Sequence, residues 1–97
     1  MAKTVLIVDD SAIVRRTVGS ALLSDGFKVC GEANNGQEAV ELAEKLSCDL
    51  IILDVSMPVM NGLQADPVLR KLVPNSPIIL YCSTQTRRLT TTKNNRS

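Results

Sequence analysis

The sequence predicts an α/β protein in which a parallel β-sheet is covered by helices. Short apolar runs alternate with segments of helical periodicity, and two of the runs, Val5–Val8 and Leu50–Leu53, are apolar at every position. Strands that are apolar on both faces are typical of a parallel sheet with helices on each side, because neither face meets water. We therefore expect a single domain of 97 residues with a doubly wound sheet built from βαβ units.

The first strand is expected at residues 4–8 and the first helix at about residues 12–24. Ser11 should cap the start of this helix, and Gly26 should end it. The helical spacing predicts an inner face made of Ile13, Val14, Val18, Ala21 and Leu22. A second strand is expected around Phe27–Cys30.

Asn35, followed three residues later by Glu38, resembles a capping box and predicts the start of a second helix. Ala39, Leu42, Ala43 and Leu46 then recur at helical spacing. The third strand is expected at residues 49–53. A third helix at residues 62–72 contains Pro67, which lacks the N–H for a helical hydrogen bond, so this helix should start late, kink or be broken.

A fourth strand is expected at residues 77–82, and the chain changes character after it. Residues 1–81 hold seven basic and ten acidic residues, whereas residues 82–97 hold four basic residues and no acid. The last fifteen residues are mainly Thr, Ser, Asn and Arg, which predicts a disordered or extended basic arm. We therefore expect a folded domain over residues 1–82 and a basic, polar tail over residues 83–97.

Composition excludes several classes of function. Two aromatic residues in the whole chain give no stacking platform for nucleic-acid bases, and four basic residues in the tail supply only non-specific affinity for DNA. No apolar run approaches the length of a membrane span or of a signal-peptide core. Cys30, Cys48 and Cys82 show no metal-site spacing and the chain has no His, so free thiols and a cytoplasmic location are expected.

Aspartates stand at the ends of the two most apolar strands. Asp9 and Asp10 follow the first strand, and Asp54 follows the third. In an open α/β sheet, ligands bind beyond the carboxyl ends of the strands, so the three carboxylates should meet there. Their mutual repulsion calls for a cation, and oxygen ligands alone favour Mg²⁺. Asp9 or Asp10 could instead cap the first helix, but capping does not explain Asp54.

The residues after Asp54 follow the pattern D-x-x-M-P-x-M-x-G, from Asp54 to Gly62. This pattern, together with Val5–Ser11, Asn34–Ala39 and Pro77–Leu80, resembles bacterial response-regulator receiver domains of the chemotaxis type over roughly residues 3–82. The resemblance implies the flavodoxin-like receiver fold, with the strands in the order 2-1-3-4-5. It also implies that the fifth strand and the last helix are missing from this chain.

The resemblance assigns roles to individual residues. Asp54 would be the phosphoacceptor, a nucleophile that takes a phosphoryl group from a histidine kinase. Mg²⁺ would be held by Asp9, Asp10, Asp54 and the backbone carbonyl of Ser56. Ser11 is interpreted as a cap rather than a phosphate ligand, and Met57 and Met60 as packing residues.

Two positions depart from the family pattern. A Thr or Ser normally ends the fourth strand, and the usual spacing from Asp54 reaches Cys82, so Ser83 or Thr84 would have to substitute for it. The family's Lys has no counterpart, because Lys93 follows no apolar run. Loss of this Lys predicts impaired phosphorylation.

Three functional hypotheses remain at this point. The first is a receiver in two-component signalling, which is a regulatory module and not an enzyme. The second is a non-signalling fragment that self-associates through the exposed fourth strand, residues 78–81. The third is a Mg²⁺-dependent phosphohydrolase, which the absence of D-x-D spacing at the nucleophile disfavours.

Overall fold

The computed structural model of the chain describes residues 3–82. Strands and helices alternate along these residues: β1 (Lys3–Val8), α1 (Ala12–Ser24), β2 (Phe27–Ala33), α2 (Gly36–Lys45), β3 (Leu50–Asp54), α3 (Gly62–Leu72) and β4 (Ile78–Tyr81). All pairings are parallel, and the strand order is β2-β1-β3-β4. The predicted doubly wound α/β class is confirmed. No fifth strand or last helix lies within residues 3–82, and the predicted tail at residues 83–97 lies outside the described part.

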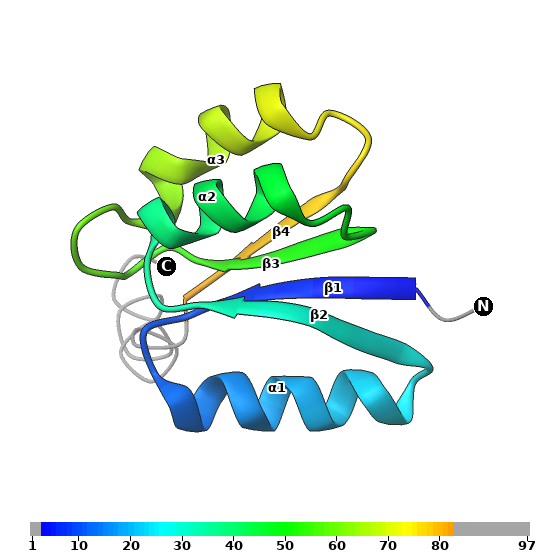
Figure 1. Ribbon diagram of the computed structural model, residues 1–97. Helices are drawn as coiled ribbons and strands as arrows, with labels where there is room; N and C mark the ends of the chain where they lie inside the picture. The colour runs from blue at the N-terminus through cyan, green and yellow to red at the C-terminus, as the bar shows by residue number, and fades with distance from the viewer. Residues whose placement is uncertain (1–2, 83–97) are drawn as a thin grey trace, which may run out of the picture.

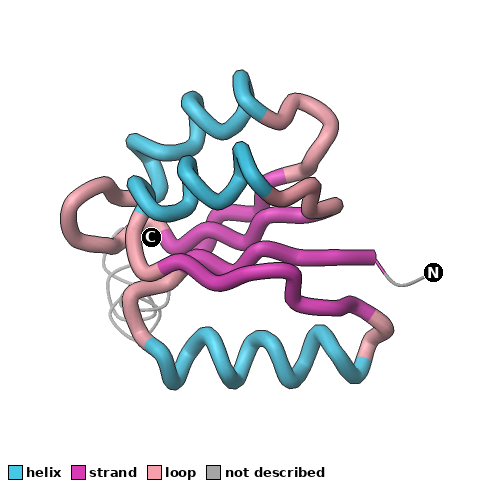
Figure 2. Tube along the Cα trace, in the orientation of Figure 1, coloured by secondary structure: helices cyan, strands magenta, loops and turns pink. Residues whose placement is uncertain are grey.

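The sheet forms the middle of three layers. Helix α1 covers one face, whereas α2 and α3 lie side by side over the other (Figure 1). Helix α1 contacts β1 and β2, and α3 contacts β3 and β4. Figure 2 shows the four strands between these helical layers. On the side of α1, therefore, no helix among residues 3–82 packs on β3 and β4.

The core explains why β1 is apolar at every position. Val5–Val8 are fully buried, and Leu6 and Val8 join a cluster between the sheet, α2 and α3. Ile51 and Leu53 of β3 and Leu69 of α3 belong to the same cluster. Each such side chain stabilises the fold by about 1.5–3 kcal/mol through the burial of apolar surface. β1 lies between β2 and β3, and α1 and α2 contact it from the two faces of the sheet, so its apolar side chains are buried on both faces.

Helix α1 begins as predicted, because the Ser11 side chain accepts a hydrogen bond from the Val14 N–H at 3.3 Å. Its predicted inner face is wrong in part. Val14, Val18 and Leu22 are half-buried, but Ile13 is 77% exposed and Ala21 is exposed as well. A helix that packs alone on its side of the described sheet contacts it along one narrow stripe, and the flanking apolar residues stay outside.

Helix α3 is continuous across Pro67, so the predicted late start or break is wrong. It begins at Gly62 with a capping box, in which Asn61 and Gln64 exchange side-chain-to-backbone hydrogen bonds of 2.9 Å. Ala65 and Leu69, on either side of the proline, are fully buried. This burial and the capping box offset the missing hydrogen bond, while Pro67 itself is exposed.

The prediction of three free thiols is wrong, because Cys30 and Cys48 form a disulfide with their Cα atoms 6.4 Å apart. The pairing of β1 with β2 contains a register shift, because the successive residues Val5 and Leu6 pair with Val29 and Gly31. Cys30 is therefore one extra residue in β2, which forms a β-bulge. Such a bulge redirects a side chain, here toward Cys48 before β3. Sequence spacing alone does not reveal this neighbour.

Asp49 ties the start of β3 to the start of β1. Its Oδ2 accepts hydrogen bonds from the Thr4 N–H at 2.8 Å and from the Thr4 hydroxyl at 3.1 Å. These two bonds hold the pKa of Asp49 below its ordinary value of 3.8. A carboxyl whose pKa is lowered by folding stabilises the protein above its unfolded pKa, and this contribution is lost as the pH falls through the folded value.

We predict that Asp49→Asn lowers the free energy of unfolding near neutral pH, because the ionised carboxylate is the stronger acceptor. The difference from the wild type should shrink as the pH falls below 3.8. Urea unfolding at a series of pH values measures it, with the exposed Asp25→Asn as the matched control. A difference that stays constant down to about pH 2 would contradict the assignment.

Candidate functional site

Three aspartates meet at the carboxyl edge of the sheet. Asp9 and Asp10 follow β1, and Asp54 is the last residue of β3, which pairs with β1 in register through Val8 and Leu53. One carboxylate oxygen from each aspartate lies within 4.8 Å of the others. Asp9 and Asp54 are fully buried, whereas Asp10 is exposed. The structure therefore brings together the three carboxylates that the strand pattern predicts.

Hydrogen bonds fix the orientation of Asp9. Its Oδ1 accepts from the Ser11 N–H at 2.8 Å, and its Oδ2 accepts from the Tyr81 hydroxyl. Arg15 of α1 donates to the Asp9 carbonyl and also pairs with Glu32 at 2.8 Å. A buried carboxylate requires such partners, because burial of an unpaired charge costs several kcal/mol.

Asp54 is held by the loop that follows it. Its Oδ1 accepts from the Ser56 N–H at 3.0 Å. Two glycines anchor the ends of this loop. The Gly62 N–H donates to the Val55 carbonyl at 3.3 Å, and the Gly36 N–H, at the start of α2, donates to the Met60 carbonyl at 2.7 Å. A Cβ at Gly36 would lie 2.5 Å from the Met60 oxygen, and one at Gly62 would lie 2.4 Å from the Asp54 oxygen. Only glycine fits at either position.

Tyr81 is a site residue that the sequence analysis did not identify. It is the last residue of β4 and pairs in register with Asp54. Burial raises the pKa of Tyr81 well above its ordinary value, and the hydrogen bond to Asp9 and the charges of the nearby aspartates raise it further. The phenol therefore stays protonated and donates to Asp9. Its position at the end of a strand beside β3 was the available signal.

The donor set of the cluster fits a hard divalent cation. Its three groups offer only oxygen atoms, and the chain has no His. Two like charges about 4 Å apart repel by roughly 4 kcal/mol at an effective dielectric constant of 20. A cation among them removes this repulsion, and carboxylate oxygens suit Mg²⁺ better than a softer metal.

The structure describes some of the remaining predicted site residues and not others. Met57 and Met60 pack against the core, as expected. Cys82 is half-buried and lines a cavity of about 340 Å³ with Ser56 and Met57, close to the loop after Asp54. Ser83, Thr84 and Lys93 lie outside the described residues.

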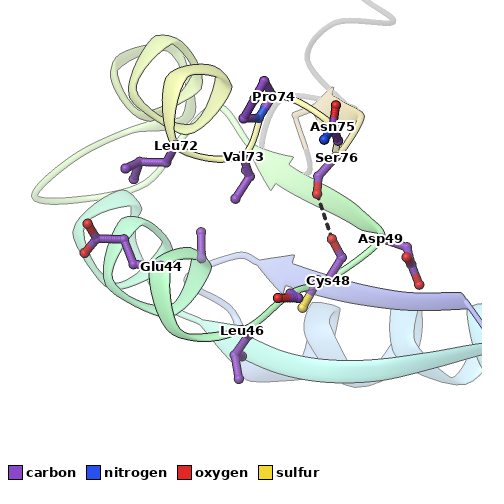
Figure 3. Close-up of a pocket in the computed structure, with 11 residues that line it drawn as sticks. Glu44, Leu46, Cys48, Asp49, Leu72, Val73, Pro74, Asn75 and Ser76 are labelled. Atoms are coloured by element: carbon purple, nitrogen blue, oxygen red, sulfur yellow. Dashed lines mark hydrogen bonds between the residues drawn. The ribbon is translucent and has the colours of Figure 1, made fainter.

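The larger cavity, of about 630 Å³, lies at the opposite edge of the sheet (Figure 3). The end of α2, the start of β3 and the connection from α3 to β4 line it. Within it the Ser76 hydroxyl donates to the Cys48 carbonyl at 2.7 Å. The carboxylates that line it, Glu44 and Asp49, belong to no metal-sized cluster among residues 3–82. We therefore place the candidate site at the aspartates.

Fold and site together define an α/β protein with a carboxylate cluster at the carboxyl edge of a parallel sheet. The family of response regulator receiver domains matches residues 5–94. The chemotaxis protein CheY of Thermotoga maritima is 45% identical over 83 residues, which is 86% of this chain and 68% of that protein. Protein-glutamate methylesterases also match, but the chain spans only 21% to 24% of the length of several of these relatives.

Solved structures of receiver domains share the fold. The response regulator domain of Thermotoga maritima CheB superposes with a TM-score of 0.80 at 35% identity, covering 99% of this chain and 72% of that one. The response regulator TrrA, solved in complex with the histidine kinase ThkA, gives a TM-score of 0.76 at 33% identity, covering 84% of this chain and 69% of that one. This chain belongs to the family of response regulator receiver domains, which act in two-component signalling.

Among residues 3–82, no helix is both long and apolar enough to cross a membrane.

We predict that Gly62→Ala lowers the free energy of unfolding by about 1–3 kcal/mol, because its Cβ would overlap the backbone of Asp54. Gly19→Ala in α1 is the matched control: its Cβ meets Val29 at 3.4 Å, an ordinary contact, so stability should rise by about 0.5–1 kcal/mol. Thermal and urea unfolding of both variants measure this. Equal effects of the two substitutions would contradict the close approach at Gly62.

Proposed function

We propose that this chain is a phosphoacceptor module that takes a phosphoryl group on Asp54 from a histidine kinase. The observation that carries the proposal is the cluster of Asp9, Asp10 and Asp54 within 4.8 Å. A carboxylate is a sufficient nucleophile toward phosphorus once the repulsion from its neighbours is neutralised. Membership of the receiver family and the histidine kinase complex of TrrA support a kinase as the phosphodonor.

Each residue has a separate role in this proposal. Asp9, Asp10, Asp54 and the Ser56 carbonyl would hold Mg²⁺, which supplies charge neutralisation when it is bound. The Ser56 N–H donates to Oδ1 of Asp54 and so orients the carboxylate that would attack phosphorus. Ser11 N–H and Arg15 keep Asp9 in place at the start of α1. The chain would act as a regulatory module that transfers a phosphoryl group to itself.

The proposal includes slow phosphorylation, because Lys93 follows no apolar run and so does not match the lysine of the family pattern. Lys3 and Lys28 lie at the starts of β1 and β2, and Lys45 and Lys71 lie in the last turns of α2 and α3, so all four lie toward the opposite edge of the sheet. A cation about 4 Å from a phosphoryl oxygen stabilises it by roughly 4 kcal/mol at an effective dielectric constant of 20. Cys82 would replace the usual hydroxyl with a weaker donor.

A cytoplasmic location stays a prediction, because the disulfide removes the argument from free thiols.

We predict that Mg²⁺ binds weakly to the wild type and at least tenfold more weakly to Asp10→Asn, which removes one charge from the cluster. Calorimetric titration measures both affinities. Asp25→Asn is the matched control, since it removes an exposed charge outside the cluster and should bind Mg²⁺ as the wild type does. Equal affinity in Asp10→Asn and the wild type would refute the metal assignment.

A second prediction concerns the modification of Asp54. Acetyl phosphate with Mg²⁺ should label the chain slowly or to low occupancy, and Asp54→Asn should not be labelled. Intact-protein mass spectrometry over a time course measures the occupancy. Rapid, stoichiometric labelling would show that the missing lysine does not limit the reaction, and labelling of Asp54→Asn would move the acceptor elsewhere.

An alternative function is that of a self-associating module without signalling. Ile79 is 51% exposed and Leu80 is 36% exposed on β4, which is the edge strand of the described sheet. Natural sheets protect such edges with charges, bulges or prolines, and here Pro77 precedes the strand. A second copy of the chain could pair with this edge and cover these side chains.

We predict concentration-dependent dimers or larger oligomers in sedimentation experiments at micromolar concentrations. Ile79→Lys should shift the chain toward monomer, because it places a charge on the edge strand. Leu23→Lys is the matched control, since Leu23 is 67% exposed on α1, away from β4. A wild-type chain that stays monomeric throughout would contradict self-association.

A further inference from the structure

We propose that Tyr81 competes with a divalent cation for Asp9, so that its phenol weakens the binding of the cation to the aspartate cluster. The inference rests on the proposed metal site and deepens it. Tyr81 would be a positioning residue, because it acts on a metal ligand and not on the reacting atoms.

The hydrogen bonds of Asp9 lead to this inference. Ser11 N–H donates to Oδ1 at 2.8 Å, and the Tyr81 hydroxyl donates to Oδ2, so both oxygens of a fully buried carboxylate already accept a hydrogen bond. A cation that binds Asp9 must share one of these oxygens with a hydrogen-bond donor or displace that donor. The Ser11 N–H belongs to the backbone at the start of α1, whereas the phenol is carried by a side chain. Of these two donors, the phenol is the one that can move away without a change in the backbone.

The surroundings of Tyr81 allow this movement without a change in the sheet. The Tyr81 carbonyl accepts from the Val55 N–H at 2.8 Å, which holds the backbone at the end of β4 beside β3. The side chain is half-buried, so rotation about its side-chain torsions can release the hydroxyl toward solvent. Asp9 then keeps the Ser11 hydrogen bond, and the phenol no longer competes with a cation for its carboxylate.

The charge of the aspartate cluster sets the balance between the Tyr81 phenol and a cation at Asp9. Without a cation, the phenol O–H satisfies Asp9 and partly offsets its repulsion from Asp10 and Asp54. With a cation, that compensation is no longer needed. The removal of a competing hydrogen bond to a carboxylate should strengthen cation binding on the order of tenfold.

Calorimetric titration of Tyr81→Phe with Mg²⁺ tests the proposal, since this variant keeps the ring and removes only the hydroxyl. We expect binding on the order of tenfold tighter than in the wild type. Unchanged or weaker binding by a folded Tyr81→Phe variant would overturn the proposal.

A second measurement needs no variant. The chain has one Tyr and no Trp, so its intrinsic fluorescence reports on Tyr81 alone. A carboxylate acceptor quenches phenol emission, so emission should rise with Mg²⁺ at the midpoint found by calorimetry. Emission that stays constant while Mg²⁺ binds would overturn the proposal even if the variant failed to fold.

The same titrations separate this inference from the proposed function. If the wild type binds no Mg²⁺, or Asp10→Asn binds it equally well, the metal site and the competition both fail. If Asp10→Asn loses binding while Tyr81→Phe keeps the wild-type affinity, the metal site stands and only the role of Tyr81 falls.

Discussion

The parallel pairing of β1 with β3 places both the centre of the core and the acidic site. Val5–Val8 are buried completely, and their pairing with Leu50–Leu53 aligns the ends of the two strands. The aspartates that follow must then lie together, whatever their mutual repulsion. The burial of these apolar side chains stabilises the fold by several kcal/mol. It therefore keeps the three carboxylates closer together than their mutual repulsion would allow in water. The acidic site is a consequence of how the core packs.

Burial and loop geometry turn this cluster into a specific site. Asp9 and Asp54 are removed from solvent and each accepts a backbone N–H from the residue two positions on, Ser11 and Ser56 respectively. Gly36 and Gly62 let the loop after Asp54 approach α2 and β3 closely. The loop contains Val59 at a φ of 67°, a conformation that costs a β-branched residue of order 1–3 kcal/mol. Hydrogen bonds at the two ends of the loop, from Gly36 to Met60 and from Gly62 to Val55, hold this strained turn.

The fold and the aspartate cluster could be predicted from the sequence, because both follow from apolar runs and from the residues that end them. The register shift at Cys30, the disulfide to Cys48 and the hydrogen bond from Tyr81 to Asp9 could not. These features depend on contacts between residues distant in sequence, for which periodicity carries no signal. Pro67 misled the helix prediction for the same reason: burial of residues on either side of it outweighed its local preference.

The proposed cation site among residues 3–82 is the cluster of Asp9, Asp10 and Asp54 at the ends of β1 and β3. A crystal structure of the wild-type chain grown with Mn²⁺, which binds at Mg²⁺-type oxygen sites and scatters anomalously, tests this proposal. We expect an anomalous peak in contact with oxygens of all three aspartates. An ordered Mn²⁺ elsewhere on residues 3–82, with these carboxylates left bound only to protein groups, would contradict it.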